Sequence, residues 1–164
     1  MFSESTYEQA WTIHPATKTH FEQMAELWEA SVRATHHFLK EEDIVFFRKA
    51  LLEYYFPNCK SLFLLKDKQG GITAFVGVNE HHIDMLFIHP SQRGKGLGKR
   101  LVRFAVEEFR AHSVDVNEQN GQALGFYQKM GFEVTARDET DGNGKPYPIL
   151  HMKLNHPHPI HSHE

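Results

Sequence analysis

Cysteine is almost absent from this chain of 164 residues, since Cys59 is the only one. A single cysteine excludes the intrachain disulfide framework on which many small secreted domains depend. Long apolar runs are also missing, because no stretch approaches the roughly 18 apolar residues of a membrane-spanning helix. The start of the chain has no cationic segment followed by an apolar signal core. We therefore expect a cytoplasmic protein with no membrane partner.

An excess of positive charge is missing as well. The chain has 18 Lys and Arg residues against 21 Asp and Glu residues, which gives a formal net charge of −3 at pH 7. This balance argues against a protein whose main partner is a nucleic-acid backbone. Hydrophobic residues make up 40% of the chain, which suffices for one buried core. We expect a single domain over residues 1–154 that works as a monomer or homodimer.

Histidine, by contrast, is frequent: the chain has 13, and several lie in the final stretch HPHPIHSHE. Because this stretch carries two prolines and no periodic pattern, we expect residues 155–164 to form a flexible tail. Metal binding by the tail is the alternative, but no Cys or carboxylate accompanies the histidines at a fixed spacing. We therefore expect no metal requirement. The tail histidines are His156, His158, His161 and His163.

Changes in hydrophobic period divide the rest of the chain into strands and helices. The predicted strands cover residues 7–13, 60–67, 72–80, 81–90, 113–117, 132–139 and 145–154. The predicted helices cover residues 19–34, 44–55, 97–110 and 121–130. Strands separated by a helix are expected to pair in parallel, and strands separated by a turn to pair antiparallel. The pattern predicts a layered α/β structure with both kinds of pairing.

Local signals define the ends of the first two helices. Thr19 and Glu22 have the spacing of a capping box, which predicts that the first helix begins there. An apolar stripe runs along the second helix, and Pro57 is expected to end that helix. The stripe consists of Ile44, Phe47, Leu51 and Tyr54 or Tyr55.

A glycine-rich corner, HPSQRGKGLGKRLV, lies at residues 89–102. Gly94, Gly96 and Gly98 stand there among basic side chains, directly before a predicted helix. A helix N-terminus carries N–H groups and partial positive charge, and glycines let a bulky anion approach the main chain. The corner therefore predicts a phosphate-binding loop, with a flexible connection and solvated cations as the alternative. The cations are Arg93, Lys95, Lys99 and Arg100.

Two familiar phosphate loops are excluded by their spacing. A P-loop, G-x-x-x-x-G-K-[ST], needs a glycine five residues before Gly98, and it needs Ser or Thr where Arg100 stands. A dinucleotide fingerprint, G-x-G-x-x-G, needs a glycine where Lys99 stands. The corner is therefore a phosphate loop of another kind.

The corner does match R-x-x-G-x-G, at Arg93, Gly96 and Gly98, and so resembles motif A of the GNAT superfamily of N-acetyltransferases. A second block, NGQALGFYQKMGF, matches N-x-x-A-x-x-[FL]-Y-x-K-x-G-F and resembles motif B of the same superfamily. The two blocks stand in the expected order and cover residues 82–137. The chain is identified as a member of this superfamily, similar to its small single-domain bacterial branch. The matching positions of the second block are Asn120, Ala123, Phe126, Tyr127, Lys129, Gly131 and Phe132.

The resemblance implies an acyl-CoA N-acyltransferase fold. In that fold a central, mixed, mostly antiparallel sheet is flanked by helices, and the strand at 84–88 splays from the parallel strand at 113–116. The resemblance also implies an acetyl-CoA-dependent N-acetyltransferase that acetylates a primary amine by direct attack in a ternary complex. The acceptor would be a small molecule, a peptide or a protein. A non-catalytic acyl-CoA-binding module is the alternative, and the presence of Tyr127 favours the enzyme.

The resemblance further assigns a cofactor site. Tyr127 stands where many members use a hydroxyl to protonate the coenzyme A thiolate, and the ordinary tyrosine pKa near 10 suits that task. A core aromatic residue is the alternative. Asn120 binds the pantetheine arm, caps its helix, or does both. Backbone groups that pair with the pantetheine arm, including an N–H for the thioester oxygen, belong to Leu86, Phe87 and Ile88. The residues that hold the pyrophosphate are Arg93, Gly94, Lys95, Gly96, Leu97, Gly98 and Lys99.

The resemblance leaves the general base open, because members of the superfamily use different residues or an ordered water. His82 and Asp84 lie two apart on a predicted strand, so both side chains share one face. We rank His82 first, followed by Asp84 and Glu80, with an exposed structural role as the alternative.

One wall of the acceptor pocket is implied at Trp28, His36 and His37. An aromatic side chain with imidazoles suits a cationic amine, although Trp28 also fits the core at its helical spacing. Cys59 has no assigned His or Asp partner, so we interpret it as an ordinary thiol rather than an acyl carrier.

Overall fold

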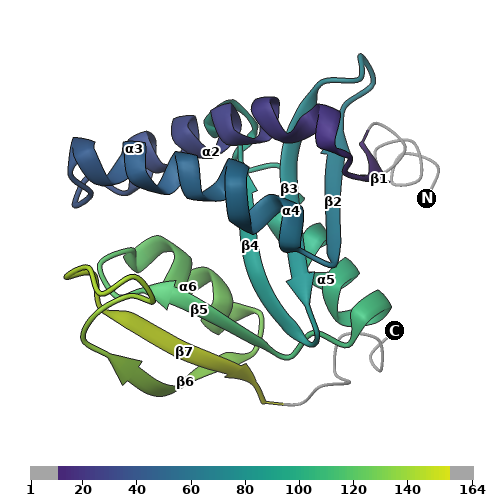
Figure 1. The fold of residues 1–164 in the computed structure, drawn as a ribbon. Coiled ribbons are helices and arrows are strands. Elements are labelled where there is room, and N and C mark those ends of the chain that lie inside the picture. The colour runs from purple at the N-terminus through teal and green to yellow at the C-terminus, as the bar shows by residue number, and fades with distance from the viewer. Residues whose placement is uncertain (1–10, 156–164) are drawn as a thin grey trace. The chain divides into compact units, whose positions relative to one another are not determined.

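The computed structural model describes residues 11–155. Most of the predicted tail, 156–164, and the start of the first predicted strand, 7–10, lie outside the described residues. Seven strands pair in the order β1-β2-β3-β4-β5-β7-β6 (Figure 1). Strands and helices follow one another as predicted, so the mixed α/β fold is confirmed. None of the helices in the described part is long and apolar enough to cross a membrane.

Two compact units make up the described chain: residues 11–77 with 85–101, and residues 78–84 with 102–155. The prediction of one domain over 1–154 stays a prediction. The first unit contains β1 (Thr12–Pro15), α2 (Phe21–Thr35), α3 (Glu41–Ala50), α4 (Phe56–Asn58), β2 (Ser61–Lys66) and most of β3 (Ile72–Asn79). The second contains β5 (Ser113–Asn117), α6 (Gly121–Lys129), β6 (Phe132–Asp138) and β7 (Ile149–Leu154). β4 (His82–Ile88) and α5 (Leu97–Phe109) contribute residues to both.

The described part of the first strand begins later than predicted and includes a proline. β1 pairs antiparallel with β2, with Thr12 opposite Lys66 and Pro15 opposite Phe63. β1 is the edge strand of the sheet, and a sheet edge tolerates proline because one side of the strand needs no donor. The prediction that the strand ends before Pro15 is therefore wrong.

The predicted capping box of α2 is also wrong. A 3₁₀ turn at Lys18–His20 precedes α2, and the helix begins at Phe21 with no side-chain cap. The extended residue is Thr17, whose N–H donates to Nδ1 of His20 at 3.0 Å. The imidazole of His20, three residues after Thr17, thus takes the role that the prediction gave to the carboxylate of Glu22.

The second predicted helix is continuous but changes its winding. α3 runs into a π-helical segment, Leu51–Tyr55, and then into α4. A π-turn holds more residues than an α-turn, so the side chains after it point in other directions around the helix axis than a 3.6-residue period predicts. Ile44 and Leu51 are buried as predicted, whereas Tyr54 is 60% exposed. Pro57 lies inside α4 instead of ending the helix before it.

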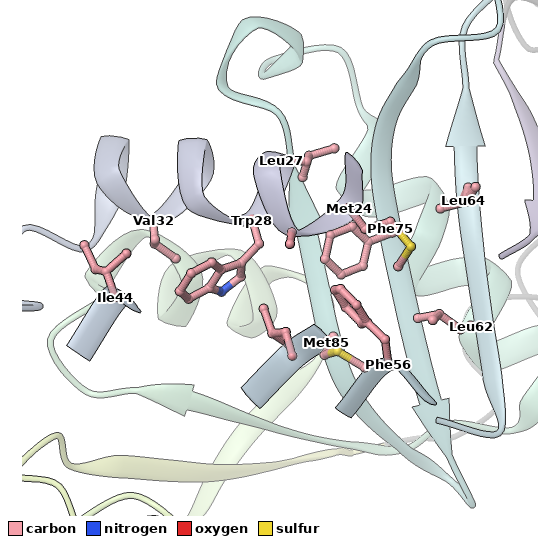
Figure 2. Close-up of a cluster of buried hydrophobic side chains, with 12 residues drawn as sticks. Met24, Leu27, Trp28, Val32, Ile44, Phe56, Leu62, Leu64, Phe75 and Met85 are labelled. Carbon is pink, nitrogen blue, oxygen red and sulfur yellow. The ribbon is translucent and has the colours of Figure 1, made fainter. Parts of the chain in front are cut away.

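A hydrophobic cluster fills the first unit between α2 and the strands (Figure 2). Trp28 is only 5% exposed and belongs to this cluster. Phe56 packs edge-on against Phe75, with ring centroids 5.6 Å apart. The other labelled members come from α2, α3, β2 and β4, namely Met24, Leu27, Val32, Ile44, Leu62, Leu64 and Met85.

Gly77 of β3 is required by packing in the same unit. A Cβ atom there would lie 2.7 Å from Cε of Met85, 2.9 Å from Sγ of Cys59 and 3.2 Å from Cδ1 of Leu62. Real Cβ atoms essentially never show the first two distances, and the third is tighter than most Cβ contacts, so a side chain here requires its neighbours to shift. The strand therefore needs a residue without a side chain where other groups cross it.

The second unit is a small sheet with one apolar face. β7 pairs antiparallel with β5 and with β6, and the β6–β7 register shifts between Val134 and Ala136. The parallel ladder of β4 and β5 consists of His82 opposite Ser113 and Ile83 opposite Val114. Alternate residues of β5 and β7 are buried, which leaves the residues between them on the other face. The buried ones are Val114, Val116, Leu150, Met152 and Leu154.

Candidate active site

The glycine corner forms the start of α5. Gly94 and Gly96 both have φ of +79°, a conformation that other residues rarely adopt, and the position of a Cβ atom at either is open space. The first intrahelical hydrogen bond runs from the N–H of Arg100 to the carbonyl of Gly96 at 3.1 Å. The N–H groups of residues 97–99 precede that bond, as at any helix start. The corner thus exposes main chain where an anion is favoured.

Two cations of the corner contact Trp11, which the sequence had not indicated. The Arg100 guanidinium donates to the Trp11 carbonyl at 2.6 Å. Nζ of Lys95 lies 6.0 Å from the centroid of the Trp11 ring and donates to Oε1 of Gln92 at 3.2 Å. Trp11 is 89 residues before Arg100, and no spacing rule connects the two positions. Trp11 therefore orients basic side chains that the loop motif alone leaves undefined.

The three residues predicted for the acceptor wall lie in different surroundings. Trp28 is buried in the cluster of Figure 2, as the core interpretation predicts. His36 is also buried, and burial together with the nearby charges of Arg93 and His37 lowers its pKa to about 4. His36 is therefore neutral at pH 7. His37 is exposed directly after α2.

The second motif builds α6. Oδ1 of Asn120 accepts from the N–H of Ala123 at 3.2 Å, so Asn120 caps the helix. Tyr127 is buried between Phe126 and Phe132, whose ring centroids lie 5.0 Å and 5.5 Å from its own. Burial raises the pKa of Tyr127 well above its usual range. The hydroxyl therefore keeps its proton at neutral pH, as an acid must.

The backbone predicted to pair with the pantetheine arm follows the short parallel ladder. Leu86, Phe87 and Ile88 come after the two paired positions of β4 and are half-buried. Phe87 packs on Phe75 with ring centroids 5.7 Å apart. The ladder thus leaves these three residues beyond its end, as expected for a splayed strand.

His82 lies among carboxylates at the start of β4. Its Nδ1 is 2.7 Å from Oγ of Ser113, and its Nε2 is 3.6 Å from Oδ2 of Asp115 and 3.9 Å from Oδ1 of Asp84. The pKa of His82 is raised, chiefly by Asp115 and against the effect of burial. Asp84 also accepts from Nδ2 of Asn79 at 2.5 Å. Glu80 lies in the preceding turn with φ of +57°.

A second histidine on the same face was not predicted. Nδ1 of His151 is 2.7 Å from Oδ1 of Asp115, and its Nε2 is 2.8 Å from Oδ2 of Asp138. The pKa of His151 is raised by Asp138 and Asp115. Burial raises the pKa of Asp115, but the hydrogen bond with His151 and the nearby imidazole of His82 together outweigh burial and hold that pKa below the usual range. The only signal for His151 in the sequence was the alternation of residues along the predicted strand 145–154, which places it on the face opposite Leu150 and Met152.

Comparisons with known proteins identify the family and the fold. The family model "Acetyltransferase (GNAT) domain" matches residues 21–155. The "Peptidyl-lysine N-acetyltransferase YjaB" of Salmonella typhimurium is 40% identical over 134 residues, which cover 80% of this chain and 89% of that protein. The solution structure of apo YjaB from Escherichia coli superposes with a TM-score of 0.81 at 35% identity, over 88% of this chain and 97% of that chain.

A more distant structure shares the fold. The PaiA N-acetyltransferase of Thermoplasma acidophilum in complex with coenzyme A has a TM-score of 0.65 at 18% identity, over 88% of this chain and 99% of that chain. The family model, the relative at 40% identity and the two sequence motifs all agree. The chain therefore belongs to the GNAT acetyltransferase family and is an acetyl-CoA-dependent N-acetyltransferase.

Proposed function

We propose that this enzyme acetylates the ε-amine of lysine side chains in a peptide or protein. The YjaB relatives are peptidyl-lysine N-acetyltransferases, which supports this acceptor because the alignment with the Salmonella protein covers 89% of its length. The observation that carries the cofactor part is the open glycine corner with Gly94 and Gly96 at φ of +79°. A primary amine of another kind is the acceptor to be tested against lysine.

The glycine corner is proposed to hold the pyrophosphate of acetyl-CoA. Main-chain N–H groups of residues 93–99 donate to phosphate oxygens, and the basic side chains supply the surrounding positive potential. Asn120 is proposed to bind the pantetheine arm while it caps α6. An N–H among residues 86–88 is proposed to donate to the thioester oxygen, a contact typically worth about 3 kcal/mol in the transition state.

The transfer is proposed to proceed by direct attack. The neutral amine attacks the thioester carbon, the new C–N bond forms and the C–S bond breaks. His82 takes the proton that leaves the amine, with Asp84 and Asp115 stabilising the charged ring. Tyr127 gives its proton to the departing thiolate, and its burial keeps that proton in place until then. Glu80 remains the lower-ranked candidate for the base.

The acceptor is proposed to approach α2 near its C-terminal end. His37 is exposed there, and His36 is neutral and adds no charge that would repel a lysine ammonium. Trp28 contributes to this wall from within the cluster, where it supports the helix that ends just before both histidines. These three residues stay predictions of acceptor binding.

The test follows thiol release from acetyl-CoA with peptides that contain one lysine and a blocked N-terminus, beside a panel of small amines. We expect turnover with the lysine peptides, and we expect Tyr127→Phe to lower kcat by about a hundredfold or more. Calorimetry should give the same Kd for acetyl-CoA in both proteins. Tyr147→Phe is the matched control, since it removes the hydroxyl of another buried tyrosine of the same unit.

Three outcomes would contradict parts of the proposal. Unchanged turnover in Tyr127→Phe would remove the proton-donor role. Turnover with small amines but none with lysine peptides would replace the acceptor. Binding of acetyl-CoA without turnover on any amine would indicate the non-catalytic acyl-CoA-binding module instead.

A further inference from the structure

Imidazoles and carboxylates alternate across four strands of the second unit. His82 comes from β4, Asp115 from β5, His151 from β7 and Asp138 from β6. Consecutive members lie 3.6 Å, 2.7 Å and 2.8 Å apart, measured between the ring nitrogens and the carboxylate oxygens. Only His82 among them was singled out by the sequence. We call these four residues the histidine–aspartate chain.

Strand register brings these side chains together. Asp115 lies directly opposite His151 in the β5–β7 ladder, and His82 lies opposite Ser113 in the β4–β5 ladder. Side chains two apart on a strand share a face, so Ser113 and Asp115 point the same way. That face is opposite the one that buries Val114. A shift in the register of any of these strands by one residue would separate the members of the histidine–aspartate chain.

Asp115 joins the two histidines through its two different oxygens. Oδ1 is 2.7 Å from His151, and Oδ2 is 3.6 Å from His82. A carboxylate accepts several hydrogen bonds, and its negative charge is shared among its partners. The more strongly His151 binds Asp115, the less of that charge stabilises a proton on His82.

Other charged groups face His82 from the elements around it. Asp84 lies 3.9 Å away on the same strand. Lys153 of β7 is opposite Ser113 in the β5–β7 ladder, and Glu133 of β6 is opposite Lys153 in the β6–β7 ladder. The pKa of His82 responds to Asp115, Asp84 and His151, and neither Lys153 nor Glu133 is among the groups that shift it. Asp115 raises the pKa of His82 most, Asp84 adds to that effect and His151 opposes it. Of these three groups, Asp115 and His151 also contact each other.

We propose that Asp115 and His151 are positioning residues that set the charge state of His82 during acetyl transfer. Asp115 stabilises the imidazole ring after Nε2 takes the amine proton, and His151 limits this stabilisation by binding the other carboxylate oxygen. In the tautomer in which Nδ1 donates to Oγ of Ser113, 2.7 Å away, Nε2 is the nitrogen that accepts the proton. The inference rests on the proposed role of His82 as the base.

The two partners have opposite expected effects, which a merely structural role does not predict. The positive charge of His151 lowers the pKa of His82, whereas Asp115 raises it. Asp115→Asn should therefore lower the pKa of His82, and His151→Asn should raise it. Asp138→Asn should act in the direction of His151→Asn, because Asp138 is the main cause of the raised pKa of His151.

The experiment titrates the His82 ring by NMR in the full chain and measures kcat/KM against pH for the same proteins. We expect the NMR midpoint and the rising limb of the rate profile to move to lower pH in Asp115→Asn and to higher pH in His151→Asn. Glu133→Gln is the control, since it removes a carboxylate from the same sheet outside the histidine–aspartate chain. It should leave both readouts near those of the wild type.

Unmoved midpoints, or midpoints that move the same way in both variants, would overturn the inference. Midpoints that move as expected beside an unchanged rate profile would remove His82 as the base, and with it the catalytic part of the inference. That second result is distinguishable from failure of the acetyltransferase itself, because turnover would persist.

Discussion

The glycine corner and the histidine–aspartate chain are built in contrasting ways. The corner is one continuous stretch, and its main contribution comes from backbone held in a conformation that Gly94 and Gly96 permit. The histidine–aspartate chain gathers side chains from four strands, and each member contacts the next. An anion site made of main chain therefore depends on local conformation. A proton site made of side chains depends on strand register.

The largest effect on acetyl-CoA binding is expected from breaking the conformation of the corner. In Gly96→Val a β-branched residue must adopt φ of +79°, which costs an L-residue about 1–2 kcal/mol. We expect the Kd for acetyl-CoA, measured by calorimetry, to rise at least about tenfold. Gly70→Val is the matched control, because Gly70 has φ of +86° and equally open surroundings in the turn before β3. A similar loss of affinity in both variants would contradict a local role for the corner.

Asn120 allows its two proposed roles to be separated. Asn120→Ala removes the acceptor for the Ala123 N–H and should destabilise the protein by about 1 kcal/mol in chemical denaturation. Asn120→Asp keeps an acceptor and should keep the stability, but it loses the amide donor and should raise KM for acetyl-CoA. If the aspartate variant had wild-type KM, Asn120 would be a helix cap alone.

Solution pH should reveal the histidine–aspartate chain in stability. The pKa values of His82 and His151 are raised, so their stabilisation is present below the ordinary imidazole pKa and is lost as pH rises through the raised values. The pKa of Asp115 is lowered, so its stabilisation is present above the ordinary carboxyl pKa and is lost as pH falls through the lowered value. The histidines and Asp115 therefore all contribute their full stabilisation between about pH 4 and pH 6.5.

Asp115→Asn should accordingly lower Tm most near pH 5.5 and less near pH 9. The loss of stability should be small, as is usual for partly exposed ion pairs. Thermal unfolding of the variant and the wild type at both values checks this window. An equal difference at the two pH values would mean that Asp115 stabilises the sheet without its charge.

The smallest effect is expected at Trp11. Trp11→Leu removes the ring under Lys95 but leaves the backbone carbonyl that binds Arg100. A cation–π contact at an exposed site is worth about 0.5–1 kcal/mol, so the Kd for acetyl-CoA should rise about two- to fivefold. Tyr or Phe at position 11 should restore most of the affinity, and failure to do so would show that the ring does not act through Lys95.

The contrast also explains what the sequence predicted. The corner and α6 were predicted because their residues are neighbours in sequence, where glycine spacing and an Asn before a helix suffice. Trp11 and His151 were missed because they reach their partners only through the folded sheet. The prediction of a capping box at Thr19 failed because a 3₁₀ turn precedes α2. The prediction that Tyr54 lies on the buried stripe of the second helix failed, because a π-turn interrupts the 3.6-residue period on which the prediction relied.

Gly77 has a consequence for how this enzyme can change. Its missing side chain is the space in which Met85, Cys59 and Leu62 meet. A side chain at position 77 requires these neighbours to shift or to become smaller. Evolution or engineering of this position in β3 is therefore coupled to its neighbours on β4 and β2, and a smaller residue at position 85 or 62 would make a side chain at position 77 easier to accept.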